Sequence, residues 1–358
     1  MTNRIINFTR GMPPSDVFPV DELVDCSRAA LQRDPSVLLQ YGRSPGYPPL
    51  CAWLAQEMGI GVDRVLTGNS SLELFAFVTQ LLLPPGARAF VESPSYDRAI
   101  ALLQRAGAQV VGIPLEPDGV DLAALEAELR RGVPALMYLI ADFQNPSGVT
   151  TSLAKRQRLA ELAREHGFWL VEDAPYRYLR LHGEPVPTLL SLAPERVLHL
   201  SSFSKVLAPG LRLGYLVGPS ETVTQLAAWA VDTYIGPVLP TQGMVYEYCR
   251  RGLLKTNIAR LCELYRPRLE AALAAAERHL PEAKGCRPDG GFFVGLTLPG
   301  PVRMDELLRR AAQVNLKLSD GRGFFPCPTD GENFIRIPFS SVTPEEIEDG
   351  VARLSLVL

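Results

Sequence analysis

The sequence is poor in the residue patterns that build metal sites and disulfide frameworks. Only four of its 358 residues are histidines, and none is spaced as a metal ligand. The six cysteines are scattered and form no CxxC pair, which is typical of free thiols in a reducing compartment. We therefore expect no bound metal, no disulfide framework and a cytoplasmic location.

The sequence also lacks a strong excess of positive or negative charge, and it lacks long apolar runs. The net charge is −3, from 36 Lys and Arg against 39 Asp and Glu, so we expect no basic surface of the kind that binds nucleic acid. No run of about 18 apolar residues is free of charges, and the start MTNRIINFTRGMPPSD lacks the apolar core of a signal peptide. We expect small molecules as partners, and neither nucleic acid nor membrane.

The sequence does contain an alternation of short apolar stretches and amphipathic ones. The amphipathic stretches at 71–83, 97–107, 121–132 and 153–167 have the apolar spacing of helices. Near-continuous apolar stretches around them indicate buried strands. This order predicts an α/β fold with a large, mostly parallel sheet of the seven-stranded type, covered by helices. The expected strands are 64–68, 87–96, 108–115, 134–143, 168–176, 196–205 and 212–219.

The C-terminal part has a different pattern. After a helical region that ends near residue 280, apolar stretches at 290–299, 311–320 and 332–340 indicate a smaller α+β unit, closed by a helix at 343–354. We expect three parts: an N-terminal segment that packs on the small domain, a large domain and a small C-terminal domain, with the boundaries 1–44, 45–255 and 256–358.

Polar residues follow several expected strands, at the edge where ligands bind in open α/β sheets. RVLTGNSS ends in Asn69 and Ser70 before a helix, where they either form an anion site or simply cap the helix. FVESPSY ends in Tyr96, which is either a core aromatic or a platform for a flat ligand. ADFQNPSG contains Asn145, either in an ordinary Asn-Pro turn or in a binding loop.

Several charged side chains have more specific positions. FWLVEDAPY brings Asp173 to a strand end with Tyr176 three residues later, and this carboxylate needs a cationic partner in a ligand or a structural ion pair. In HLSSFSKVLAPGLRLGY, Lys205 and Arg212 can bind one anion, or the lysine can act as a nucleophilic amine. NFIRIPFS puts Arg336 inside an apolar strand, where it needs an anion from the protein or from a substrate.

Together these residues supply a phosphate cradle, a stacking aromatic, a buried acid, an amine and a second arginine, the set that pyridoxal phosphate requires. The motifs SFSKVLAPGLRLGY, QNPSG, VEDAPY and FIRIPFS resemble those of fold-type I pyridoxal-phosphate enzymes of the class I/II aminotransferase superfamily. The resemblance covers nearly the whole chain. It is strongest to 2-aminoadipate, aromatic and multi-substrate aminotransferases and to the aminotransferase-like domain of MocR-type regulators. It implies an aspartate-aminotransferase-like fold in which residues 45–255 bind the cofactor.

The resemblance also implies a role for each residue. Lys205 would form the Schiff base with the cofactor and move the proton, and Asp173 would pair with the pyridine nitrogen. Asn145 and Tyr176 would hydrogen-bond the phenolic oxygen of the ring, and Tyr96 would stack on the ring. The residues around the phosphate would be Asn69, Ser70, Ser202, Ser204 and Arg212.

Substrate binding and assembly follow from the same resemblance. Arg336 would hold the substrate α-carboxylate, with Asn145 and the backbone of Gly11 nearby. Tyr41 would reach the phosphate of a neighbouring subunit, which implies a homodimer with shared active sites. Departures from the family pattern, none of which removes these groups, lie in the SDGRGFF stretch and at Cys51, Ala141, Ala174 and Arg177.

The expected activity is the transfer of an amino group from an L-amino acid to a 2-oxo acid. The alternatives are another reaction on the same scaffold, by a decarboxylase, lyase or oxidase, and a non-catalytic, ligand-sensing homologue. Because INFTRGMPP lies close to residue 1, we expect no winged-helix domain of the regulator type before it. Arg10 and Arg322 either meet a second substrate carboxylate, which would favour a dicarboxylic amino acid, or face water and local acids such as Asp320.

Overall fold

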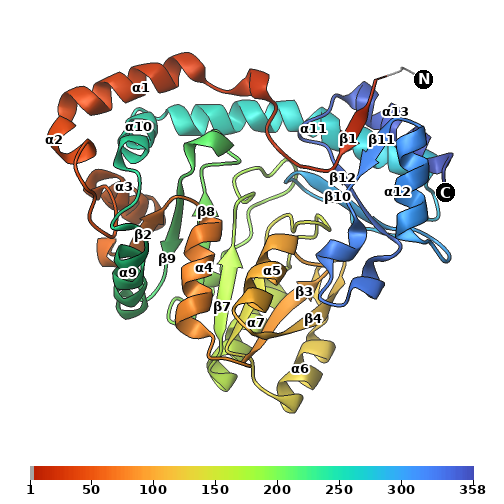
Figure 1. Ribbon diagram of the computed structural model, residues 1–358, viewed down its shortest axis with the longest axis horizontal. Helices are drawn as coiled ribbons and strands as arrows, with labels where there is room; N and C mark the ends of the chain where they lie inside the picture. The colour runs from red at the N-terminus through yellow and green to blue at the C-terminus, as the bar shows by residue number, and fades with distance from the viewer. Residues whose placement is uncertain (1–3) are drawn as a thin grey trace.

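A large mixed sheet forms the frame of the computed structural model, which describes residues 4–358 (Figure 1). The strand order is β2-β9-β8-β7-β6-β3-β4-β5. β9 is antiparallel to both of its neighbours, β2 and β8, and β5 is antiparallel to β4. All other neighbouring strands are parallel. The strands are β2 (Val65–Gly68), β3 (Arg88–Ser93), β4 (Gln109–Glu116), β5 (Gly119–Val120), β6 (Leu136–Leu139), β7 (Trp169–Asp173), β8 (Val197–Ser202) and β9 (Gly214–Val217).

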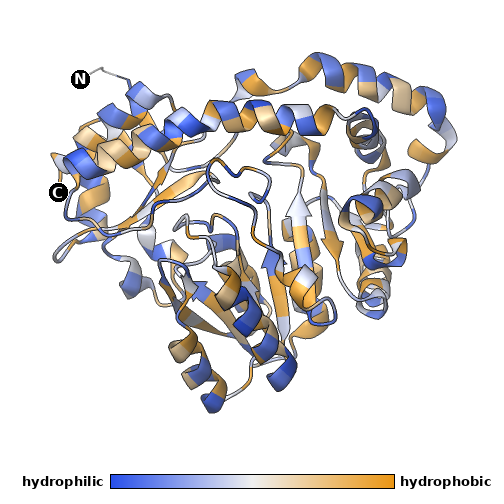
Figure 2. Ribbon diagram, turned by 180° about the vertical axis from the view of Figure 1, so that it is seen from behind, coloured by the Kyte–Doolittle hydropathy of each residue, from blue (hydrophilic) through white to orange (hydrophobic). Residues whose placement is uncertain are grey.

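This sheet confirms the predicted α/β fold, because a strand coincides with each of the seven expected stretches, with β4 extending one residue beyond its stretch. The sequence pattern does not predict β5, since two residues are too few to show a period. Figure 2 shows mostly hydrophobic strands, with hydrophilic residues on the outer faces of the helices. The helices of this unit are α3 (Pro48–Met58), α4 (Ser71–Leu82), α5 (Asp97–Arg105), α6 (Leu122–Arg131), α7 (Leu153–His166), α8 (Leu189–Leu192), α9 (Ser220–Tyr234) and α10 (Leu239–Arg250).

A smaller α+β unit lies at the other end of α11 (Leu253–His279), the long helix that runs toward it from α10 (Figure 1). It has two two-stranded sheets, one parallel, β1 with β11, and one antiparallel, β10 with β12. Its elements are β1 (Ile6–Phe8), β10 (Phe293–Thr297), α12 (Met304–Gln313), β11 (Leu316–Leu318), η4 (Gly321–Phe324), η5 (Pro328–Gly331), β12 (Phe334–Pro338) and α13 (Pro344–Ser355).

The N-terminal segment contacts both units. β1 pairs with β11 of the small unit, whereas α1 (Val20–Arg33) packs against α10, and α2 (Pro35–Leu38) follows it. Residues 1–3 of the expected segment 1–44 lie outside the described residues. The N-terminal segment thus bridges the two units and does not pack on the small unit alone. We propose domain boundaries near residues 44 and 255. Within residues 4–358, no helix has the length and apolarity needed to cross a membrane.

Candidate active site

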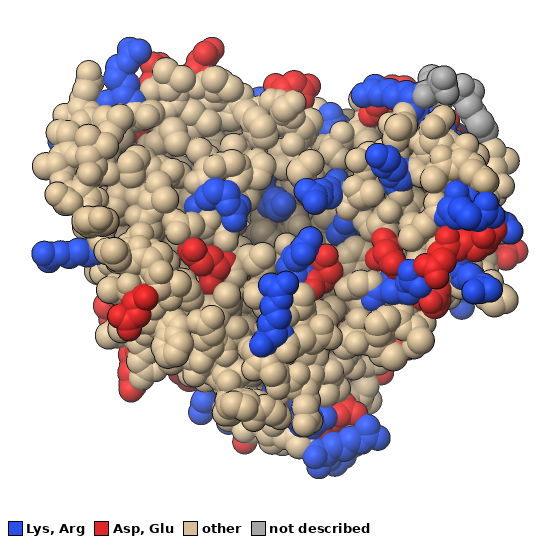
Figure 3. Space-filling model, in the orientation of Figure 1, with Lys and Arg blue, Asp and Glu red and all other residues tan. Residues whose placement is uncertain are grey.

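A cavity of about 610 Å³ opens beyond the carboxyl ends of the strands. The loops after parallel strands meet at one edge of the sheet, so residues far apart in the sequence share this space. Figure 3 shows the hollow near the centre of the face, with Lys and Arg side chains around it. The expected residues that line it are Gly11, Ser70, Tyr96, Asn145, Asp173, Tyr176, Ser202, Ser204, Lys205, Arg212 and Arg336.

Asp173 is the buried acid of the cavity. It ends β7 with only 7% of its surface exposed, and the Tyr138 hydroxyl donates to its Oδ2 (2.7 Å). Its Oδ1 is buried and accepts no hydrogen bond from the described residues. Burial raises the pKa of Asp173 to about 6, opposed by the Tyr138 hydrogen bond. A buried carboxylate oxygen without a partner is an acceptor that a protonated ring nitrogen can satisfy.

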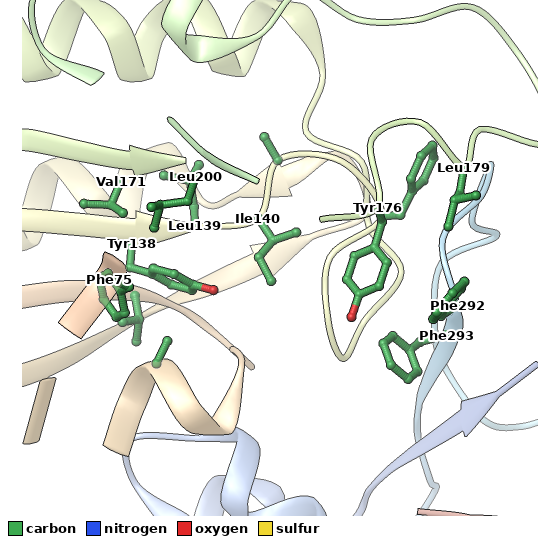
Figure 4. Packing of buried hydrophobic residues seen from close by; sticks show 14 of the residues in the cluster. Phe75, Tyr138, Leu139, Ile140, Val171, Tyr176, Leu179, Leu200, Phe292 and Phe293 are labelled. Atoms are coloured by element: carbon green, nitrogen blue, oxygen red, sulfur yellow. The ribbon is translucent and has the colours of Figure 1, made fainter. Parts of the chain in front are cut away.

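Tyr138 was not among the expected site residues. It lies within the apolar stretch of β6, where its spacing is that of a core aromatic, so no sequence signal separates it from the core. Its ring does pack on Phe75, with 4.8 Å between the centroids. Figure 4 shows Tyr138 beside Phe75 and Tyr176 beside Phe293, on either side of Ile140.

Lys205 follows β8 and is the free amine of the cavity. No acceptor among residues 4–358 lies within hydrogen-bond distance of its Nζ, which is 6.0 Å from the centre of the Tyr176 ring. Burial lowers the pKa of Lys205 to about 8, and the positive charges of Arg336 and Arg212 act in the same direction against Asp173. A substantial fraction of this amine is therefore uncharged, and nucleophilic, slightly above neutral pH.

Four of the five residues predicted around a phosphate line the cavity together: Ser70, Ser202, Ser204 and Arg212. Ser70 caps α4 by accepting from the Glu73 backbone N–H (3.0 Å), and the first turn of this helix lines the cavity. Ser202 donates to the Ser204 hydroxyl (2.9 Å), and Arg212 lines the same wall. Ser70 thus both caps the helix and faces the cavity, and the helix N-terminus adds a partial positive charge.

Two expected residues lie outside the cavity lining. Asn69 is committed to its own helix and a neighbouring loop, because its side chain donates to Glu73 (3.3 Å) and accepts from the Val238 backbone N–H (3.1 Å). Its backbone N–H donates to Glu73 as well (2.8 Å). Tyr41 lies on the surface with 78% of its area exposed. Neither residue therefore reaches the cavity of its own chain.

Arg336, in β12, is a buried cation without an anion. It is 8% exposed, and its guanidinium donates to the Asn145 Oδ1 (2.8 Å), the Thr9 carbonyl (2.8 Å) and the Ser319 hydroxyl (3.1 Å). No carboxylate among residues 4–358 lies within ion-pair distance of it, and its Nε has no acceptor. Burial lowers the pKa of Arg336, so a bound carboxylate would relieve an unfavourable arrangement.

The Phe293 ring, which packs on Arg336, leaves no room for a side chain at position 11. A Cβ at Gly11 would collide with the Phe293 ring, which itself lies 4.4 Å from the Arg336 guanidinium carbon. The second ring on this guanidinium belongs to Phe324, at 4.7 Å, which comes from the unusual SDGRGFF stretch. The two rings confine the guanidinium to one orientation toward the cavity.

The two additional arginines have different surroundings. Arg322 donates to Asp305 (2.6 Å) and Asp320 (2.8 Å) and does not line the cavity, as expected for a residue that pairs with local acids. Arg10 lines the cavity and has no ion pair among the described residues. Arg98, which the sequence analysis did not single out, also lines it, with its Nε 3.7 Å from Asp97.

These residues fit pyridoxal phosphate. The unpaired Asp173 oxygen matches a ring nitrogen, the Lys205 amine with its lowered pKa matches an aldehyde, and the α4 N-terminus with Arg212 matches a phosphate. The fold and the cavity thus define a pyridoxal-phosphate enzyme of fold type I.

The chain belongs to the family of class I and II aminotransferases, whose model matches residues 3–354. It is 34% identical to a 2-aminoadipate transaminase from Thermus thermophilus, over 99% of this chain and 90% of that protein. It is 32% identical to aromatic-amino-acid aminotransferase 1 from Thermococcus litoralis, over 99% and 88%. The crystal structure of the T. thermophilus α-aminoadipate aminotransferase LysN, complexed with N-(5'-phosphopyridoxyl)-L-leucine, matches with a TM-score of 0.93 and 33% identity, over 99% and 92%.

The chain is therefore a pyridoxal-phosphate-dependent aminotransferase, which transfers an amino group from an amino acid to a 2-oxo acid. This confirms the activity and the cofactor expected from the sequence. Transcriptional regulators also occur among the relatives, in agreement with the resemblance to MocR-type proteins.

Proposed function

We propose that this aminotransferase acts on L-amino acids held through the α-carboxylate by Arg336. One observation carries the proposal: Arg336 is a buried guanidinium without an anionic partner among residues 4–358, in the same cavity as the amine of Lys205. A carboxylate there satisfies the charge and accepts two parallel hydrogen bonds, which orients the neighbouring amino group in the cavity.

In this proposal the other residues act on the cofactor and on one proton. Pyridoxal phosphate supplies an aldehyde that condenses with amines and a ring that accepts electrons when its nitrogen is protonated. Asp173 holds the proton on that nitrogen, and Lys205 takes up and returns the proton at the substrate α-carbon. Asn145 and Tyr176 donate to the ring oxygen. Tyr96 packs on the ring, and Ser70, Ser202, Ser204 and Arg212 hold the phosphate.

The preferred substrates in this proposal carry a second carboxylate. Arg322 is committed to Asp305 and Asp320, and Arg98 lies beside Asp97, so we assign Arg10 to a distal carboxylate. The Thermus thermophilus relative is named for 2-aminoadipate, a dicarboxylic amino acid. Because Arg10 lines the cavity and Arg322 does not, we assign the selection of the side chain to Arg10.

Substitution of Arg336 and Arg10 should separate these two contacts. Arg336→Ala should raise KM for every amino-acid donor about 10- to 100-fold, because a charge-assisted carboxylate contact is lost. Arg10→Ala should raise KM only for glutamate and 2-aminoadipate and leave aliphatic and aromatic donors unchanged. A panel of donors and 2-oxo acids measures both, with 2-oxo acid as the expected product.

Arg322→Ala is the matched control, and it should leave the donor ranking unchanged. Release of ammonia, CO2 or peroxide in place of stoichiometric amino transfer would contradict transamination as the main reaction. If aromatic donors surpass dicarboxylic ones and Arg10→Ala leaves the order intact, the second-carboxylate proposal is wrong while the role of Arg336 can still stand.

We also propose a homodimer in which Tyr41 completes the phosphate site of the partner. Tyr41 is exposed and does not line its own cavity, and several exposed apolar side chains precede it in the N-terminal segment. A second copy of the chain would remove this apolar surface from water. The exposed apolar residues are Val20, Val24, Leu31, Val37 and Leu39.

A hybrid dimer tests the shared site. When Tyr41→Phe and Lys205→Ala subunits are mixed, both defects fall in one site of the hybrid and the other site is intact. The mixture should therefore exceed the mean activity of the two parents at limiting cofactor. Light scattering should give twice the chain mass, and a fully active monomer would contradict the dimer.

We finally propose a cytoplasmic location. All six cysteines are free, and Cys26, Cys51 and Cys249 are buried, which suits a reducing compartment. Cell fractionation of the native source tests this directly, and recovery with extracellular proteins would contradict it.

A further inference from the structure

A buried acid outside the cavity, Asp142, faces three arginines. It is 2% exposed, and it accepts from Arg156 at Oδ1 (2.8 Å) and from Arg177 at Oδ2 (2.9 Å). Arg180 approaches Oδ1 at 3.5 Å. Burial acts to raise the pKa of Asp142, but Arg156 and Arg177 outweigh it and lower the pKa. The carboxylate therefore stays charged at neutral pH, and its hydrogen bonds are charge-assisted.

Asp142 and Arg177 belong to the two loops that present the proposed ring-oxygen donors. Asp142 lies three residues before Asn145, in the loop after β6, and Arg177 directly follows Tyr176, in the loop after β7. The same Arg177 Nη1 also donates to the Val186 carbonyl (2.8 Å), which gives the guanidinium a second anchor. The Asp142–Arg177 bond is thus a direct tie between the segments that carry Asn145 and Tyr176.

The loop after β6 needs such a tie because part of its backbone is unfavourable. Phe143 has a φ of 56°, in the left-handed region that non-glycine residues seldom adopt. This conformation persists where the surroundings hold it. Arg180 covers the Phe143 ring (4.7 Å), and the Gln144 side chain donates to Glu92 (3.1 Å). Contacts on both sides of Phe143 therefore hold the approach to Asn145.

We propose that Arg177 and Asp142 are positioning residues that fix the spacing between Asn145 and Tyr176 and thereby set the acidity of the bound cofactor. This inference rests on the proposed function, in which both side chains donate to the ring oxygen. Hydrogen bonds donated to that oxygen stabilise its negative, proton-free form. Looser spacing would weaken them, so the bound cofactor would lose its proton at a higher pH.

The test is the pH midpoint of the visible absorbance change of the loaded protein. Arg177→Met should raise this midpoint by about half a pH unit or more, because even a modest weakening of a hydrogen bond is a severalfold change in an equilibrium. The apparent Kd of pyridoxal phosphate should rise about threefold. Arg177→Lys, which keeps the charge and one donor direction, should show a smaller shift.

Arg88→Met is the matched control. Arg88 has a similarly buried side chain, 21% exposed against 24% for Arg177, and likewise bonds a carboxylate, Glu128 (2.5 Å), and backbone carbonyls. Arg88 is the first residue of β3, so it lies at the amino-terminal end of this strand, whereas the cavity lies beyond the carboxyl ends. Arg88→Met should lower the melting temperature as Arg177→Met does, without moving the absorbance midpoint.

Asn145→Ala separates this inference from the proposed function beneath it. If Asn145→Ala leaves the midpoint unchanged, the proposed role of Asn145 is wrong. If Asn145→Ala raises the midpoint but Arg177→Met moves it no more than Arg88→Met does, the positioning role of Arg177 and Asp142 is wrong, and the proposed role of Asn145 still stands. The other titratable or charged groups that line the cavity remain the same in each comparison: Arg10, Tyr96, Asp97, Arg98, Asp173, Tyr176, Lys205, Arg212, Asp320 and Arg336.

Discussion

Replacement of Lys205 by alanine should reduce turnover by about 10³-fold or more while pyridoxal phosphate still binds. The residue is expected to supply both the amine that attaches the cofactor and the group that moves the substrate proton, and a positioned acid–base group alone contributes about 10² to 10⁴ in rate. Its pKa of about 8, lowered by burial, suits both tasks near neutral pH. Single-turnover measurements with an excess of amino-acid donor give the effect directly.

Chemical trapping identifies the attachment site independently of turnover. Borohydride should fix the cofactor on the peptide that contains Lys205 in the wild type and leave no adduct in Lys205→Ala. Lys255→Ala, at an exposed helix position, is the control and should retain both adduct and activity. An adduct on another lysine in the wild type would falsify the assignment.

Asp173→Asn should lower turnover on the order of 10²- to 10³-fold, because a preorganised charge at the reacting group is removed. The carboxylate keeps the ring nitrogen protonated, and an amide exerts no comparable attraction on that proton. The amide can still accept the Tyr138 hydrogen bond, so the fold should survive. Turnover and the apparent Kd for pyridoxal phosphate are the measurements, and near-normal values for both would refute the role.

In the cofactor-free protein, by contrast, Asp173→Asn should be favourable, because it should raise the stability of the fold. Burial raises the pKa of Asp173 from its ordinary value near 3.8 to about 6, so ionisation disfavours the folded state above pH 4 and most strongly above pH 6. Asp173→Asn should therefore stabilise the apoprotein at pH 7 by at most about 3 kcal/mol, and the gain should vanish below pH 4. Denaturant unfolding at both pH values measures it.

Glu172→Gln is the control for this pair of effects. Glu172 precedes Asp173 in β7 and so points to the opposite face of the sheet, where it pairs with His199 (2.8 Å). Its substitution should destabilise the fold and leave the Kd for pyridoxal phosphate unchanged. A gain in apoprotein stability from Glu172→Gln as well would point to a general effect of buried acids rather than to the cavity.

Much of the site could be predicted because parallel strands end at a common edge. Ser70, Asn145 and Lys205 each follow a strand in the sequence and Asp173 ends one, and the structure brings them into one cavity. Arg336 was predictable for another reason, since a cation in an apolar strand requires a partner. These inferences use only the order of residues along each strand and loop and the energetic cost of burying a charge.

Other features depend on contacts between distant segments. Asn69 has a side chain suited to a phosphate site, but Glu73 and Val238 engage it instead. Tyr138 has the sequence spacing of a core residue, yet its hydroxyl reaches Asp173. Arg10 and Arg322 were equivalent candidates in the sequence, and only the position of Asp305 and Asp320 distinguishes them.

The sequence by itself determined the α/β class, the cofactor and the principal charged groups, because strand period, helix spacing and the mismatch of a charge with its apolar neighbours are local properties. The tertiary structure alone decided which atoms remain without a partner. Among residues 4–358, Asp173 Oδ1 has no hydrogen-bond partner and the Arg336 guanidinium has no ion pair, whereas Asp142 is surrounded by three arginines from two separate segments, α7 and the loop after β7. The physical reason is that hydrogen bonds and ion pairs act over a few ångströms, so their partners are chosen by the packing of remote segments.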